Sequence, residues 1–206
     1  MPEVTPEPAM ESTPLGTDAK TLNEFNDAIN GCLNCPLGAT RTKFVFGSGN
    51  PNADVMFVGE APGEKEDLEG LPFVGRSGRL LTDILKAIDL SREDVYIANI
   101  LKCRPPDNRD PNKAEIEECE PYLLKQIELI KPKLLVALGR ISATTLLRSK
   151  ESLTAMRGQV FDYHGTDMVV TYHPAALLRN PNWKRPAWED FKKIREIYLE
   201  KRGEQA

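Results

Sequence analysis

The sequence lacks any apolar run long enough to cross a membrane, and it contains only two histidines and four cysteines. No stretch approaches the roughly 18 consecutive apolar residues of a transmembrane helix, and no basic segment followed by an apolar one opens the chain. We therefore expect a cytoplasmic protein. The 206 residues, 40% of them hydrophobic, can bury the core of one compact domain.

The sequence also lacks the excess of positive charge that is typical of a protein binding DNA over a wide surface, because its net charge is −4. A local basic surface is still compatible with this total. Basic residues lie beside the motifs described below, although they could equally be ordinary solvated charges. They are Arg76, Arg79, Lys102, Arg104, Arg109, Arg179, Lys184 and Arg185.

The amino-terminal residues 1–18 are rich in Pro, Glu, Ser and Thr and have few large apolar side chains. Such a segment cannot compensate the entropy lost on ordering, so we expect a disordered tail followed by one domain over residues 19–206. In that domain, short apolar runs predict strands at residues 54–59, 95–100, 133–139 and 168–173.

Segments with helical periodicity alternate with these strands. They predict helices over residues 20–30, 75–88, 112–131 and 142–148, with Asn112 and Glu115 forming a capping box and Pro121 kinking or interrupting the third. Residues 158–164 predict a small edge hairpin. Alternating strands and helices indicate an α/β fold with a mainly parallel, four-stranded sheet, whose ligands bind beyond the carboxyl ends of the strands.

The four cysteines have the spacing of a ligand set rather than of a disulfide framework. Cys32 and Cys35 form a C-x2-C pair, and Cys103 and Cys119 follow far downstream. Two cysteines on a tight turn together with two distant ones can surround a metal ion or a cluster. The spacing alone does not separate zinc from an iron-sulfur cluster, and buried thiols without a ligand are the remaining alternative.

A loop rich in glycine and proline, GEAPGEKEDLEGLPFVGRSG, follows the first predicted strand. Gly59 and Gly63 allow close backbone approach, and Phe73 lies in a loop, where it can stack on a planar ligand or pack into the core. The amides of residues 75–78 begin a helix, a position that favours an anionic group such as a phosphate.

Five motifs in order resemble family 4 uracil-DNA glycosylases. They are GEAPGEKED, LPFVGR, ANILKCRPPDNRDPN, the four-cysteine spacing and YHPAALLRNP, and the likeness runs from about Cys32 to the carboxyl end. The resemblance implies a three-layer α/β/α sandwich and a 4Fe-4S cluster held by Cys32, Cys35, Cys103 and Cys119. It also implies base excision repair, in which the enzyme flips uracil out of DNA, hydrolyses its N-glycosidic bond and leaves an abasic site.

The resemblance further implies roles for individual residues. Phe73 would stack on uracil, Asn99 would bind its pairing edge, and His173 would donate to O2 as negative charge develops on the leaving base. Glu60 would position or activate the attacking water, although backbone amides of Glu60 and Ala61 could contact uracil instead, beside Gly59.

Several neighbouring residues could have an ordinary surface or packing role instead of a functional one. Glu66 and Asp67 are nearby acidic candidates that we expect to be exposed loop charges, and His164 is expected at the surface. Leu177, Leu178 and Arg179 could wedge into the minor groove or simply pack as a short helix. The cluster would hold the loop that presents Lys102, Arg104 and Arg109 to phosphates, and Arg76 is a further DNA-binding candidate.

These patterns predict a monofunctional glycosylase, because no lysine stands out as a Schiff-base nucleophile. A related branch that captures DNA covalently has Gln after the motif glutamate, where this chain has Ala61. The expected partner is uracil-containing DNA, single- or double-stranded, with a sliding clamp as a further candidate and a monomeric state. The competing hypotheses are a cluster-bearing DNA-damage sensor without turnover and an electron-transfer protein.

Overall fold

The structure, a computed structural model, describes residues 16–203. The predicted tail therefore lies outside the described residues, except for residues 16–18, which form a turn. In the described range, no helix combines the length and the apolar character that a membrane span requires.

Six strands of the described chain form one sheet in the order β1-β3-β2-β4-β6-β5. Their bounds are β1 Ser48–Gly49, β2 Val55–Gly59, β3 Tyr96–Asn99, β4 Leu134–Leu138, β5 Val160–Tyr163 and β6 Thr166–Thr171. The four central strands are parallel, as predicted, and β1 and β5 pair antiparallel at the two edges. The sheet has two strands more than the four predicted: β5 forms the predicted edge hairpin with β6, whereas β1, with two residues, is too short to show a pattern.

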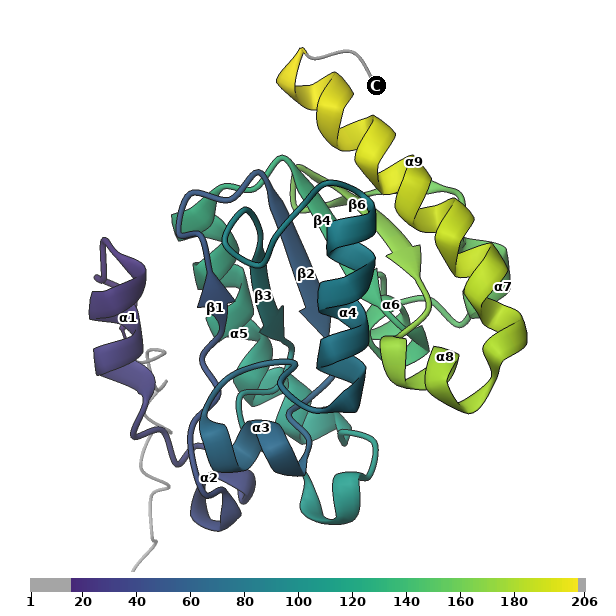
Figure 1. Ribbon diagram of the computed structural model, residues 1–206. Helices are drawn as coiled ribbons and strands as arrows, with labels where there is room; N and C mark the ends of the chain where they lie inside the picture. The colour runs from purple at the N-terminus through teal and green to yellow at the C-terminus, as the bar shows by residue number, and fades with distance from the viewer. Residues whose placement is uncertain (1–15, 204–206) are drawn as a thin grey trace, which may run out of the picture.

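Helices cover both faces of this sheet (Figure 1). Their bounds are α1 Leu22–Ile29, α2 Leu37–Thr40, α3 Glu64–Glu69, α4 Arg76–Ala87, α5 Lys113–Ile130, α6 Arg140–Leu146, α7 Leu153–Met156, α8 Pro174–Arg179 and α9 Lys184–Arg202. Short 3-10 turns lie at Pro106–Asn108 and Pro181–Trp183. The arrangement confirms the predicted α/β class and its layers of helix, sheet and helix.

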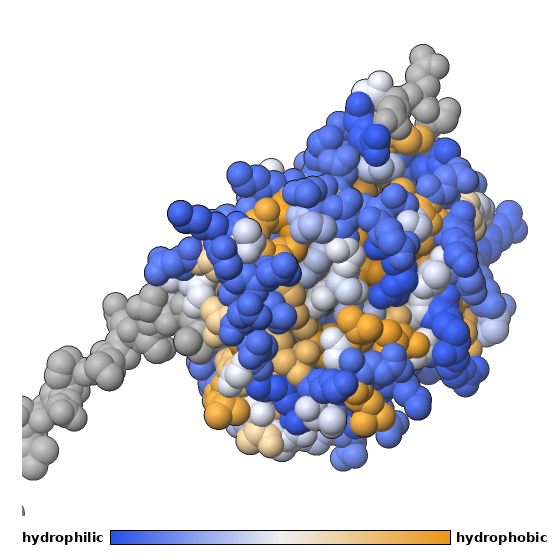
Figure 2. Space-filling view, turned by 60° about the vertical axis from the view of Figure 1, so that its left-hand side comes forward, coloured by the Kyte–Doolittle hydropathy of each residue, from blue (hydrophilic) through white to orange (hydrophobic). Residues whose placement is uncertain are grey.

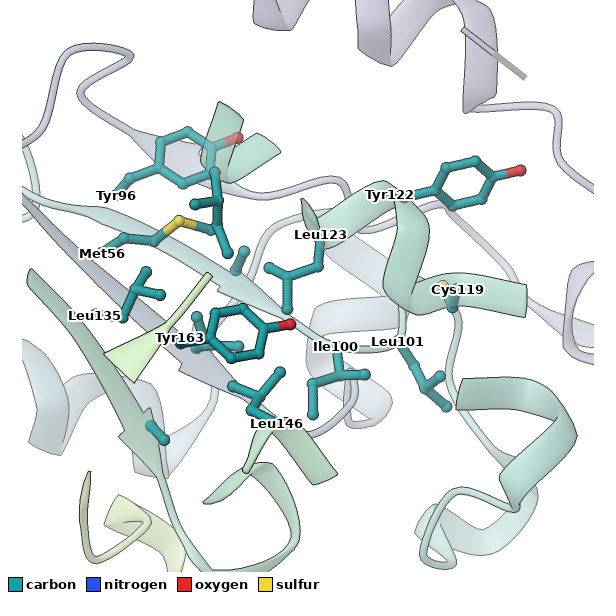
Figure 3. Packing of buried hydrophobic residues seen from close by; sticks show 14 of the residues in the cluster. Met56, Tyr96, Ile100, Leu101, Cys119, Tyr122, Leu123, Leu135, Leu146 and Tyr163 are labelled. Carbon is teal, nitrogen blue, oxygen red and sulfur yellow. The ribbon is translucent and has the colours of Figure 1, made fainter. Parts of the chain in front are cut away.

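The strands divide the core between the two layers because successive side chains point to opposite faces. On β2, Met56 and Val58 pack toward α1, α5 and α6, whereas Val55 and Phe57 pack toward α4 and α9. Every residue of β2 and β4 is buried, as expected for central parallel strands. Figure 3 shows the hydrophobic cluster on the side of α1, α5 and α6, with Cys119 and Tyr122 projecting from α5.

Helix α5 begins at the predicted capping box. The Asn112 side chain accepts from the Glu115 amide and the Glu115 carboxylate accepts from the Asn112 amide, each at 2.9 Å. Pro121 was predicted to kink or interrupt this helix; the interruption is wrong, because α5 runs unbroken from Lys113 to Ile130. Packing of its buried face against the sheet outweighs the one hydrogen bond that proline removes.

Hydrophilic residues cover most of the surface seen in Figure 2, and hydrophobic ones form small separate patches. The exposed large apolar side chains belong to several different elements. They are Leu33, Leu68, Leu71, Val160, Leu178, Trp183 and Trp188. Scattered single residues of this kind need no explanation. Trp183 lines the cleft described below, and Leu178 precedes Arg179, which also lines it, so these two are the informative ones.

Helix α4 packs its glycine directly on the backbone of the preceding loop. A Cβ built on Gly78 would lie 1.8 Å from the carbonyl oxygen of Phe73. This contact leaves no room for a side chain and fixes where Phe73 lies relative to α4.

We predict that Gly78→Ala lowers the free energy of unfolding by about 1–3 kcal/mol through overpacking. An ordinary glycine-to-alanine change inside a helix instead stabilises it by up to about 1 kcal/mol. Urea denaturation measures the difference, and Asp83→Ala at an exposed position of α4 is the matched control, expected to change stability by less than about 0.5 kcal/mol. A more stable Gly78→Ala variant would contradict the packing described here.

Candidate functional site

A cleft of about 640 Å³ opens where the four parallel strands end. Residues that line it follow or end each of those strands: Glu60 after β2, Asn99 at the end of β3, Gly139 after β4 and His173 after β6. Parallel strands bring their carboxyl ends to one edge of a sheet, so residues far apart in sequence meet here. The cleft lies where the sequence predicted the ligand site.

Asn99 is the buried polar group at the base of the cleft, with 2% of its surface exposed. Its Oδ1 is buried and has no hydrogen-bond partner among the described residues. A Cβ on Gly59 would lie 2.3 Å from this oxygen and 2.7 Å from the Phe73 ring. Gly59 therefore acts by leaving space, since any side chain there would displace both neighbours.

Phe73 lines the cleft in a strained backbone conformation, with φ at 54°. A bulky residue adopts this left-handed region only when its surroundings enforce it. Arg92 supplies one brace, since its guanidinium donates to the carbonyls of Phe73 at 3.1 Å and Pro72 at 2.8 Å. The Phe73 ring is 5.3 Å from that of His173, at an angle of 32°.

Glu66 supplies the second brace. Its Oε1 accepts from the amides of Val74 and Gly75, each at 2.9 Å. The prediction that Glu66 and Asp67 are exposed loop charges was wrong, because both are buried and Asp67 accepts from the Thr42 amide. The amide of Gly75, the first of those predicted to bind a phosphate, thus already donates to the Glu66 carboxylate.

His173 is held as a neutral imidazole with a defined tautomer. Burial in the cleft lowers the pKa of His173 to about 4, and the charge of Arg179 acts in the same direction. Its Nδ1 accepts from the Ala175 amide at 3.1 Å, so the proton of the neutral ring resides on Nε2. The other histidine, His164, is exposed in the β5–β6 turn, as predicted.

Glu60 has a carboxyl group whose protonation changes near neutral pH. Burial raises the pKa of Glu60 to about 7, the Asp110 carboxylate adds to the rise, and Arg140 opposes it. All three residues line the cleft. A carboxyl group with such a pKa can exchange a proton at neutral pH, which a carboxylate in water cannot do efficiently.

Lys102 does not lie where a phosphate could reach it, so its prediction as a DNA contact was wrong. The side chain is fully buried, and Nζ donates to the Asn99 carbonyl at 2.8 Å and to Gln126 Oε1 at 2.6 Å. Gln126 in turn donates to the Phe46 carbonyl at 2.9 Å. Burying a charged group is costly unless hydrogen bonds satisfy it, as they do here. The role of Lys102 is therefore to hold the backbone of Asn99 in place.

The other residues predicted to contact DNA differ in how close to the cleft and how exposed they are. Arg179 lines the cleft, Arg76 is exposed at the start of α4, and Arg104 is bonded to Asn108 at 2.8 Å. Leu178 is 38% exposed, whereas Leu177 is buried, so only Leu178 is available as a wedge. Gly59 and Ala61 adjoin the cleft as expected, the second as part of its lining.

Three residues that shape the site, Arg92, Arg140 and Asp110, were missed, and the role of a fourth, Glu66, was not foreseen. Arg92 and Glu66 brace Phe73, while Arg140 and Asp110 set the electrostatics of Glu60. Arg140 carried a signal, since it follows the third predicted strand, at the edge where ligands bind, and Glu66 and Asp110 lie inside the motifs GEAPGEKED and ANILKCRPPDNRDPN. The partners of Glu66, Arg92 and Asp110 lie on other segments of the chain, and the local sequence does not identify those partners.

The four cysteines pack against one core cluster, with Cys103 and Cys119 buried and Cys32 and Cys35 partly buried. Hydrogen-bond donors meet three of the sulfurs: the Tyr122 hydroxyl at Cys32, the Arg41 guanidinium at Cys103 and the Lys102 amide at Cys119, at 3.3, 3.5 and 3.3 Å. Such donors stabilise sulfur that carries negative charge.

Burial raises the pKa of Cys103 to about 11 and that of Cys119 to about 12, and neighbouring cysteines contribute at both. Among the described residues, no group of three or more His, Cys, Asp or Glu side chains gathers in the geometry of a metal-ion site.

Comparisons with known proteins agree with this geometry. A sequence model of the uracil DNA glycosylase superfamily matches residues 46–192. The type-4 uracil-DNA glycosylase of Sulfurisphaera tokodaii is 49% identical over 87% of this chain and 86% of its own length. Those of Saccharolobus solfataricus and Archaeoglobus fulgidus are 46% identical over 87% and 43% over 86% of this chain, covering 88% and 94% of their own lengths.

We predict that the Glu60 carboxyl titrates near pH 7 and that Asp110→Asn moves this titration to lower pH, because it removes a neighbouring negative charge. Carbon-detected NMR of the side-chain carboxyl measures both pKa values. Asp162→Asn, which alters an exposed carboxylate in the β5–β6 hairpin, is the control. A Glu60 pKa near 4.5 in the unaltered protein would contradict the electrostatics described here.

Proposed function

Because this chain belongs to the uracil DNA glycosylase superfamily, and within it to the type-4 uracil-DNA glycosylases, we propose that it excises uracil from DNA by hydrolysing the N-glycosidic bond. The partner is DNA, and the product is an abasic site for base excision repair. The observation that carries the proposal is the unpaired Oδ1 of Asn99 in the cleft.

The Asn99 carboxamide fits the pairing edge of uracil. Its Oδ1 accepts from N3–H of the base, and its amide nitrogen donates to O4. A buried acceptor without a partner costs about 1–3 kcal/mol, and a bound uracil would remove that cost. A base without the N3 proton leaves the acceptor unpaired, which provides discrimination.

Phe73 and His173 bind the rest of the ring. The base stacks on the Phe73 side chain, which the two braces hold in place before any ligand arrives. His173 donates from Nε2 to O2 of uracil, where negative charge develops as the glycosidic bond breaks. The lowered pKa keeps the ring neutral, so the donor is an imidazole rather than an imidazolium.

Glu60 lies at the same strand edge and acts on the water. Above pH 7 its carboxylate accepts a proton from the attacking water and stabilises the cationic sugar that forms when uracil leaves. Below that pH the neutral form predominates and both effects weaken. Among the described residues no lysine lines the cleft, which supports hydrolysis without a Schiff base and without strand cleavage.

Arg76, Arg104 and Arg179 bind phosphates in this proposal, and Leu178 enters the stack that the base has left. Leu178 suits that role because it is exposed beside the cleft while Leu177 anchors α8. The chain acts as a monomer.

We also propose that Cys32, Cys35, Cys103 and Cys119 hold a 4Fe-4S cluster. Two observations support it: the four sulfurs share one cluster of packed residues, and hydrogen-bond donors meet three of them. When bound, the cluster supplies a structural crosslink between the amino-terminal segment and α5. Lys102 would link it to the base-binding site, since its amide meets Cys119 and its ammonium holds Asn99.

Replacing His173 by alanine should lower the single-turnover rate of uracil release by about 100- to 1,000-fold, the usual effect of losing one donor to a developing anion. Binding of uracil-containing DNA should change little. His164→Ala, which alters the other histidine at the surface, is the matched control and should retain full activity. Unchanged release by His173→Ala would remove this residue from the mechanism, and no release by the unaltered protein would favour a damage sensor without turnover.

The cluster proposal predicts four irons and four acid-labile sulfides per chain in protein purified without oxygen. Cys119→Ala should lose most of both and should unfold at lower temperature, because a structural site stabilises only the folded state. Elemental analysis and thermal unfolding measure these quantities. One zinc per chain without sulfide would overturn the assignment in favour of a zinc site.

A further inference from the structure

The cleft continues beyond the residues that the proposed mechanism uses. Lining residues to which the mechanism gives no role are Ile141, Leu153, Tyr172, Ala176 and Trp183, and we call this group the far part of the cleft; Arg179 lines the cleft as well. A volume of about 640 Å³ is in the range that holds a drug-sized ligand, and one pyrimidine fills only part of it. The remaining space adjoins His173 because Tyr172 is its immediate neighbour in the chain.

Two aromatic rings form a stack in this far part. The ring of Tyr172 lies 5.2 Å from that of Trp183, at an angle of 16°, and the guanidinium of Arg157 lies 4.4 Å from the centre of the Tyr172 ring. Tyr172 is 7% exposed, whereas Trp183 is 40% exposed. Trp183 is therefore the exposed ring of the pair, and Tyr172, which Arg157 also contacts, is the buried one.

The stack is held rigidly from behind. Arg157 binds both oxygens of Asp190, at 2.6 and 2.9 Å, and also donates to the Pro186 carbonyl at 2.7 Å. Asp190 accepts a further bond from the Thr171 hydroxyl at 2.7 Å. These contacts join β6 and α9 and fix the platform before a ligand binds, so little entropy is lost on binding.

The charges around the outer ring suit a nucleic acid strand. Arg179 lines the same cleft, and Lys184 and Arg185 follow Trp183 directly and are exposed. An exposed aromatic ring beside several basic side chains is the arrangement with which proteins bind single-stranded nucleic acid without sequence specificity. The residues next to Trp183 in the chain, Asn182 and Lys184, are polar and exposed, which also suits a charged strand.

We propose that Trp183 is a second stacking site, which binds the base next to the extruded uracil in the same strand. This inference rests on the proposed function. A flipped uracil stays covalently attached to the nucleotides on either side, so one of these lies next to the cleft. That neighbour loses a stacking partner when uracil leaves the helix, and the outer face of Trp183 replaces it.

The test uses single-stranded oligonucleotides with one deoxyuridine, in which an abasic tetrahydrofuran spacer replaces the base on the 5′ side, on the 3′ side or on neither. Trp183→Ala should raise KM for the unmodified strand by roughly 5- to 150-fold, which corresponds to the 1–3 kcal/mol of one stacked base. The spacer on one side should abolish the difference between the variant and the unaltered protein. Trp183→Phe should restore most of the affinity.

Trp188→Ala is the matched control, because Trp188 is 38% exposed on α9 and does not line the cleft. It should leave KM unchanged on every strand. An equal loss for Trp183→Ala with and without either spacer, or no loss at all, would overturn the proposal.

A second readout does not depend on uracil excision. In a Trp188→Phe background, Trp183 is the only tryptophan of the sequence. Its fluorescence should be quenched when a uracil-free single strand of thymidines binds, and it should not respond to the same strand with all bases replaced by spacers. Quenching in a protein that released no uracil would sustain the stacking site while the proposed function failed. Equal responses to both strands would reject the stacking site.

Discussion

One unpaired acceptor, the Oδ1 of Asn99, is the constraint on which the architecture of the site depends. A buried polar atom without a partner lowers stability, and so does the left-handed backbone of Phe73 beside it. Both persist because neighbours leave no alternative: Gly59 gives the space, Lys102 holds the Asn99 backbone and Glu66 holds the Phe73 loop. Stability is thus exchanged for a site that is formed before the base arrives.

The parallel sheet explains why these groups meet. Each parallel strand ends at the same edge, and the loops that follow carry the carboxyl, carboxamide and imidazole groups into one cleft. The cysteines lie behind that edge rather than in it, and Lys102 contacts both regions through its amide and its ammonium group. A structural cluster at the cysteines would therefore act on the base-binding site through backbone position.

Periodicity and turn residues, which are local signals, predicted the central strands, helices α4 and α5 and the capping box at Asn112. The resemblance to family 4 uracil-DNA glycosylases implied that Phe73, Asn99 and His173 act in one site, and all three line the cleft. The sequence did not predict β1, whose two residues carry no period. It also placed Lys102, Glu66 and Asp67 at the surface, since a charged side chain gives no sign of the partner that buries it. Gln126 is 24 positions from Lys102, and the partners of Glu66 and Asp67 belong to other loops.

The most direct test of the central claim is a crystal structure of the protein with free uracil. The account predicts the base stacked on Phe73, with N3 within hydrogen-bond distance of Asn99 Oδ1 and O2 within that distance of His173 Nε2. Uracil bound elsewhere, or bound in the cleft with the Asn99 oxygen still unpaired, would contradict it.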